Sequence, residues 1–265
     1  FHVHLGVLEL PLAVPGTWFG TTTTSLGSAP LLVALGSDLT NQRLLVTTTA
    51  TFLVAVVVFA LVVADVLDRS LLWWKPPVLV AYSLGAAKLL SPVGYHAAAF
   101  YITSWGYSVL AGMFLKTVFS RQRPCISMPG RERLGQLRLL PLHEHLCMGY
   151  TAIESFPSGD ACGGAVASTC LHLVTGGQSL LVWLPMLLSA YGRMFIWAHH
   201  FADVVVGAGI GVAITLAANR LIQWQSCTWF ELLACMLIFT VMKKGVEKLR
   251  PELPKELAGG KHYYG

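Results

Sequence analysis

Residues Ala161–Gly192 have the sequence ACGGAVASTCLHLVTGGQSLLVWLPMLLSAYG, without a single Asp, Glu, Lys or Arg. A helix that crosses a bilayer needs about 20 apolar residues, so this stretch is too long for one crossing. The pair Gly176-Gly177 interrupts it near the middle, and adjacent glycines are typical of turns. We therefore expect two antiparallel membrane-spanning helices joined at these glycines.

Uncharged stretches of similar length lie on both sides of this segment. Ala202–Ile222 predicts another span, and its glycines Gly207, Gly209 and Gly211 favour close helix packing over a nucleotide-binding loop. The other predicted spans are Leu44–Ala64, Pro76–Ser91, and one that opens near Tyr95 after a turn at Pro92-Val93-Gly94 and ends at Lys116.

The two ends of the chain are expected to lie outside this core. Thr228–Met242 is short and contains Glu231, so it is either a seventh span or an interfacial helix. Residues 1–42 form an apolar N-terminal extension, and residues 223–265 hold the candidate seventh span and a basic tail. The expected fold is all-α, an integral membrane bundle of six spans with a candidate seventh.

The composition of the whole chain supports a membrane protein. Of 265 residues, 55% are apolar and 12% are charged, whereas a soluble domain has about 25% charged residues. The net charge is +5, but no basic stripe interleaved with aromatic residues is evident, so nucleic acid is not an expected partner. Most charges gather on one face, which the positive-inside rule assigns to the cytoplasm or to an organelle's matrix or stroma.

Three polar clusters lie where predicted spans begin or end, and ionisable groups there are costly enough to suggest function. They are KTVFSRQRP at Lys116–Pro124, FPSGD at Phe156–Asp160 and RMFIWAHHFAD at Arg193–Asp203. Taken singly, they have structural explanations: a basic flank, a helix cap and a packed histidine. Alternating spans bring all three to one face. Together they offer cations, a helix N-terminus, a hydroxyl and a His with a carboxylate, which are the groups that phosphoryl transfer uses.

The clusters resemble the motifs of the PAP2, or type 2 phosphatidic acid phosphatase, superfamily of membrane lipid phosphatases. The family pattern runs K-x6-R-P, P-S-G-H and S-R-x5-H-x3-D, and nine of its eleven positions agree here. The agreeing residues are Lys116, Arg123, Pro124, Pro157, Ser158, Gly159, Arg193, His199 and Asp203. The resemblance covers residues 43–222 and implies a six-span, metal-independent phosphatase without a cofactor.

The resemblance also implies a role for each matched side chain. His199 would attack phosphorus and form a phosphohistidine, and Asp203 would hold the imidazole in the required tautomer. The phosphate-binding residues would be Lys116, Arg123, Ser158, Gly159 and Arg193. The implied substrate is a lipid phosphate that enters from the bilayer, either a phosphatidic acid-like monoester or an isoprenoid or other lipid diphosphate.

Two positions depart from the family pattern, and Asp160 is the more important. Gly192 replaces a serine, and Asp160 replaces the histidine that protonates the leaving group. The ordinary pKa of Asp is about 3.9, which cations lower and burial raises. Three alternatives remain: a leaving group that needs little protonation, an acid pH optimum, or a catalytically weak or inactive structural or lipid-binding subunit of a membrane complex. Homo-oligomerisation is equally open.

Other candidates are weaker. The loop run His143-Glu144-His145-Leu146-Cys147 has metal-capable side chains, but no further ligand follows at a recognised spacing, so we predict no metal site. Cys125 and Cys147 could pair in an oxidising compartment, whereas a cytoplasmic loop predicts free thiols. His200 could replace the missing acid, although adjacent helical residues point about 100° apart, which favours packing.

Overall fold

The computed structural model describes residues 29–37, 76–119, 121–124, 154–177, 179–195 and 198–249. Within these residues the regular secondary structure is helical, with one isolated β-bridge between Gln122 and Glu154. The helices are α3 (Ala29–Gly36), α5 (Pro76–Leu90), α6 (Pro92–Phe119), α10 (Gly159–Val174), α11 (Leu184–Phe195), α12 (Phe201–Ile222) and α13 (Trp229–Leu249), with 3-10 helices η2 (Leu180–Trp183) and η3 (Trp224–Ser226).

The all-helical class and the division of the long uncharged stretch are confirmed. Helix α10 ends at Val174, and the chain turns through Gly176 and Gly177 at φ angles of 66° and 72°. Glycine adopts this left-handed region without the steric cost that a side chain would bring. Helix α5 begins at the proline pair Pro76-Pro77, because proline fits the first turn of a helix, where the missing N–H leaves no bond unmade.

The structure differs from the sequence predictions at several points, and α6 ends at Phe119 and not at the predicted Lys116. The predicted turn at Pro92-Val93-Gly94 is wrong, because α6 already begins at Pro92 and only Ser91 separates it from α5. Helix α13 continues past the predicted end at Met242 to Leu249. Part of the N-terminal extension forms α3, which packs on α5, α6 and α10. The predicted span Leu44–Ala64 lies outside the described residues.

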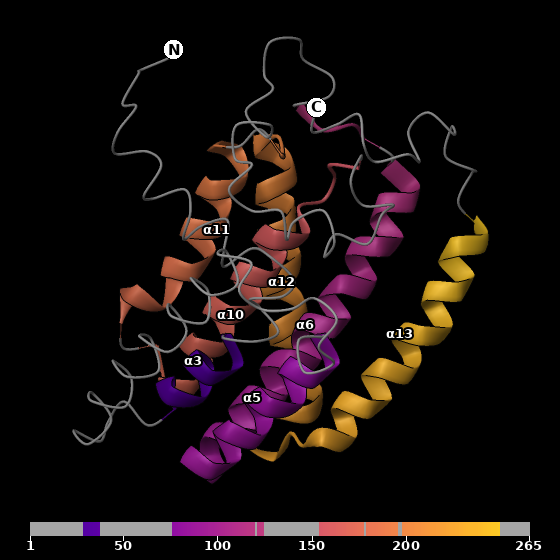
Figure 1. Ribbon diagram of the computed structural model, residues 1–265. Helices are drawn as coiled ribbons and strands as arrows, with labels where there is room; N and C mark the ends of the chain where they lie inside the picture. The colour runs from indigo at the N-terminus through magenta and orange to yellow at the C-terminus, as the bar shows by residue number, and fades with distance from the viewer. Residues whose placement is uncertain are drawn as a thin grey trace, which may run out of the picture.

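Helices α10, α11 and α12 pack together, and α6 crosses beside them with α13 along its other side (Figure 1). Small residues allow the closest approach, between α12 and the start of α10. A Cβ on Gly207 would collide with the Ser158 carbonyl oxygen, and one on Gly211 with the Cys162 carbonyl oxygen. Among the described residues, no atom lies within 4 Å of a Cβ placed on Gly209. The predicted packing role therefore holds for Gly207 and Gly211 and is wrong for Gly209.

Two described helices, α6 and α12, are long and apolar enough to cross a membrane. Leu180–Met194 and Trp229–Met242 are apolar but shorter. The remaining spans of the expected six are not established by this criterion. Length and hydropathy thus support crossing for the two helices that carry Lys116 and Asp203 near their ends.

The glycine contacts give a stability prediction with a matched control. Gly207→Ala should lower the free energy of unfolding by about 1–3 kcal/mol, because the new methyl group would push α12 away from Ser158. Gly209→Ala changes the same helix by the same atom in open space and should be neutral or slightly stabilising. Thermal unfolding of the detergent-solubilised chain measures both, and equal effects would contradict the proposed contact.

Candidate active site

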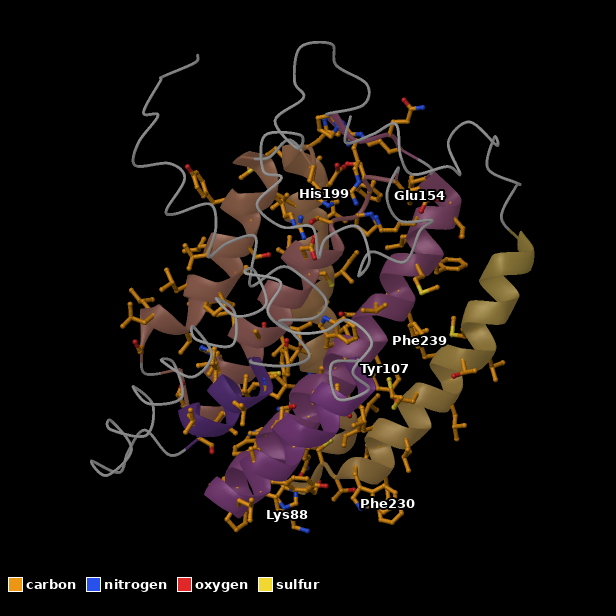
Figure 2. All side chains as sticks on the ribbon, viewed as in Figure 1. Lys88, Tyr107, Glu154, His199, Phe230 and Phe239 are labelled. Carbon is orange, nitrogen blue, oxygen red and sulfur yellow. The ribbon has the colours of Figure 1, made fainter. Side chains whose placement is uncertain are left out.

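The candidate site lies at one end of the helix bundle. Figure 2 places His199 and Glu154 at this end, and Lys88 and Phe230 at the opposite end. The end of α6, the start of α10, the end of α11 and the start of α12 meet here (Figure 1). The three clusters that the sequence predicted to share a face are therefore brought together.

The end of α6 is joined to the segment that leads into α10. The buried Lys116 donates from Nζ to the backbone oxygen of Glu154 at 3.0 Å. The Ser155 N–H donates to the backbone oxygen of Arg121 at 2.6 Å, beside the β-bridge between Gln122 and Glu154. These bonds hold Lys116 and the following arginines against the FPSGD segment.

Helix α10 begins in the FPSGD segment with a serine cap. The Ser158 hydroxyl accepts the Ala161 N–H at 3.3 Å, as expected for an N-cap residue. Its own N–H donates to the backbone oxygen of Asp203 at 2.9 Å. Gly159, the first residue of α10, is exposed, and no atom of the part of the chain that the structure describes lies within 4 Å of where its Cβ would be. The helix N-terminus therefore remains approachable at Gly159.

His199 is buried between α11 and α12, and its ring is held by a backbone group. Its Nδ1 lies 2.7 Å from the Ser155 carbonyl oxygen, which can only accept, so Nδ1 carries the proton. The Nε2 atom then bears the lone pair. Burial lowers the pKa of His199 well below its ordinary value. The charges of Arg123, Lys116 and Arg193 lower it further, while the Ser155 bond raises it. The imidazole is therefore neutral at pH 7.

Asp203 lies in the first turn of α12 and is fully buried. Its Oδ1 accepts from Arg121 Nη1 at 2.9 Å. Its Oδ2 accepts from the His200 N–H at 2.8 Å and from the Ser155 hydroxyl. The same Oδ2 is 4.0 Å from His199 Nδ1. The Ser155 carbonyl is thus the hydrogen-bond partner of the imidazole, and the Asp203 carboxylate lies farther from Nδ1.

Asp160 pairs with one of the expected phosphate-binding cations. Its Oδ2 forms an ion pair with Nη2 of Arg193, a side chain that is 2% exposed in the last turn of α11. Its backbone oxygen accepts from the Ser189 hydroxyl at 2.8 Å. Burial raises the pKa of the Asp160 carboxyl, against the lowering effects of Arg193, Arg123 and Lys116. Burial therefore affects the pKa of Asp160 more than the neighbouring cations do, which the sequence alone could not decide.

Two side chains that the sequence did not single out also belong to the site. The Ser155 carbonyl accepts from the His199 ring and the Ser155 hydroxyl donates to Asp203, while Arg121 forms an ion pair with Asp203. In the sequence, Ser155 is marked only by its place next to the FPSGD motif, and Arg121 only as a further basic residue between Lys116 and Arg123. Arg123 donates to the backbone oxygen of Ala198, next to His199, at 3.4 Å. The loop candidates His143–Cys147 and Cys125 lie outside the described residues.

A helical protein with several cations around a neutral histidine has the electrostatics expected of an enzyme that acts on phosphoryl groups. Residues 97–227 match the model of the PAP2 superfamily. The chain therefore carries a PAP2 superfamily domain, which includes every motif residue from Lys116 to Asp203. This assignment indicates phosphatase-type activity at the level of the family. No curated protein and no solved structure matches the chain.

The contacts of Asp203 predict a large structural cost for its removal. Asp203→Ala leaves the Ser155 hydroxyl, the His200 N–H and Arg121 without their acceptor, and should lower the free energy of unfolding by about 3–5 kcal/mol. Arg121→Ala removes one of the three donors and leaves the Ser155 hydroxyl and the His200 N–H, so it should cost less than Asp203→Ala, about 1–3 kcal/mol. Thermal unfolding of both variants tests the order, and a smaller loss for Asp203→Ala would refute it.

Proposed function

We propose that this protein is an integral membrane phosphatase that removes phosphate from a lipid phosphomonoester or lipid diphosphate through a phosphohistidine at His199. The observation that carries the proposal is the state of this residue. Its Nδ1 is bound to a carbonyl, its Nε2 bears the lone pair, and the charges of three cations act on it. A phosphoryl group held by those cations would meet a neutral nucleophile.

Each cation has a part in this mechanism. Lys116, Arg123 and Arg193 bind the non-bridging oxygens and stabilise the charge that they carry in the transition state. The Gly159 N–H and the Ser158 hydroxyl add donors at the start of α10. As the bond from Nε2 to phosphorus forms, the imidazole gains positive charge, which the nearby Asp203 carboxylate favours. Water then hydrolyses the phosphohistidine.

A lipid substrate is supported by the apolar surface around the site. The described parts of α6 and α12 expose large apolar side chains near the ends that carry the site, namely Phe114, Val118, Phe119, Phe201, Val205 and Val206. Such a surface suits contact with acyl chains. Because α6 and α12 also have the length and hydropathy of membrane spans, the substrate would approach laterally, with its phosphate at the helix ends.

A second candidate function is a non-catalytic, lipid-binding or structural subunit of the same fold. The ion pair between Asp160 and Arg193 is the observation that favours it. A carboxylate on this cation competes with a phosphate oxygen, and the acid position lacks the family's histidine. Phosphoenzyme trapping separates the two functions.

Trapping with a radiolabelled lipid phosphate should label the wild-type chain. His199→Ala should abolish the label, because the variant lacks the nitrogen that is proposed to attack phosphorus. His200→Ala removes the adjacent imidazole but keeps the backbone N–H that binds Asp203, so the label should persist.

The labelling is measured on the full chain in detergent at several values from about pH 5 to about pH 8. Absence of label and of turnover with both monoesters and diphosphates at every value would favour the non-catalytic subunit. Label that persists in His199→Ala would disprove the assignment of the nucleophile.

The lowered pKa of His199 predicts where activity is lost on the acid side. Protonation removes the Nε2 lone pair, and a lowered pKa moves this protonation to lower pH. The fall in kcat/KM should therefore begin below the ordinary histidine value of about 6.5. It should also lie at the same pH for two substrates whose phosphates ionise differently. An acid limb at or above that value would contradict a neutral, buried His199.

A further inference from the structure

Asp160 shares its charged surroundings with His199. Lys116 from the end of α6, Arg123 from the segment after it and Arg193 from α11 act electrostatically on both side chains. Arg193 also pairs directly with the Asp160 carboxylate, which is 20% exposed. An oxyanion bound by these cations in reach of His199 would therefore also lie beside Asp160.

A carboxylate beside a phosphoryl group restricts which form of that group can bind. An ionised carboxylate and an ionised phosphoryl oxygen are both acceptors, so two such groups in contact repel one another. A proton between them converts the contact into a charge-assisted hydrogen bond. Phosphate monoesters lose their second proton near pH 6, so the monoanion, with one P–OH donor, is present close to neutrality. Among oxyanions of equal charge, one with a proton fits this site better.

Resting on the proposed function, we propose that Asp160 is a specificity-determining acceptor that selects a singly protonated phosphoryl group and passes its proton to the leaving oxygen. The substrate then supplies the proton that the family's histidine would have donated. The selected class is the monoanionic phosphoryl group of a monoester or the protonated terminal phosphate of a diphosphate.

The reaction balances with this proton. Nε2 of His199 bonds to phosphorus of the monoanion as the bond from phosphorus to the bridging oxygen breaks. The P–OH proton passes to Asp160 and then to the bridging oxygen, which leaves as the alcohol or the lower phosphate. The phosphohistidine retains the one negative charge of the substrate. Water then attacks phosphorus, the bond to nitrogen breaks, and dihydrogen phosphate leaves with His199 neutral and Asp160 ionised.

The ionisation of Asp160 suits this exchange. Burial raises the pKa of the Asp160 carboxyl above its ordinary value, so this carboxylate accepts a proton more readily than an exposed one. The ion pair with Arg193 holds the carboxylate beside one of the cations that would bind the phosphoryl oxygens. Asp203 is already surrounded by three donors, so it is not available for the same role.

The test compares two non-hydrolysable ions of the same shape and charge. Methylphosphonate near pH 6 is mainly a monoanion with one P–OH proton, whereas methanesulfonate is a monoanion without one. Calorimetric binding to the full chain in detergent should favour methylphosphonate by at least about tenfold. In Asp160→Asn the preference should fall below about threefold, because an amide can donate to either ion. Glu231→Gln makes the same acid-to-amide change at the far end of the bundle and should keep the wild-type preference.

Each outcome decides between the two proposals. Equal affinity of the wild type for both ions, or an unchanged preference in Asp160→Asn, overturns the role of Asp160 and leaves the proposed function standing. Failure to bind either ion overturns the selection by Asp160, while the proposed function is decided separately by the phosphoenzyme trapping. Should Asp160→Asn not fold, the wild-type ratio alone still decides.

Turnover tests the proton transfer itself. Asp160→Asn should lower kcat at least about tenfold more for an alkyl phosphate than for 4-nitrophenyl phosphate, whose leaving oxygen needs no proton. An equal loss with both substrates overturns the transfer step.

Discussion

The buried carboxylate of Asp203 joins the chain segments that form the site. Arg121 follows α6, Ser155 precedes α10 and His200 is the N-cap of α12, and each of the three donates to this side chain. A carboxylate in the protein interior is stable only with such partners, so satisfying it fixes the three segments relative to one another. The position of His199 follows, because Ser155 carries both the hydroxyl bound to Asp203 and the carbonyl that accepts from the imidazole.

Hydropathy predicted the helices whose apolar runs end at strong turn residues. The break at Gly176-Gly177 is of this kind, since both residues have positive φ. Prolines misled the prediction at Pro92, because a proline that can open a turn can equally occupy the first turn of a helix. Helix α3 was missed because its eight residues are too few for a span and lie in a segment rich in Gly, Pro and Thr.

Motif spacing predicted that Lys116, Arg193 and His199 would meet, because alternating helices bring their ends to one side. The contact between the Ser155 carbonyl and the His199 ring could not be predicted, because every residue type has a backbone carbonyl. Arg121 was indistinguishable from the other arginines of its segment until its contact with Asp203 was seen. The sequence therefore predicted the charged groups of the site, while the contacts that orient the imidazole required the fold.

The ion pair between Asp160 and Arg193 also bears on the release of product. A guanidinium that is 2% exposed is costly without an anionic partner. A phosphoryl group that binds Arg193 must displace or share this carboxylate, and so gains less than it would from an unopposed cation. Inorganic phosphate and the substrate both incur this cost, but only the substrate has an apolar tail whose burial offsets it. The Asp160 carboxylate thus makes binding depend more on the lipid part of the substrate than on its phosphate. Inorganic phosphate has no lipid part, so it is held less tightly and leaves the site.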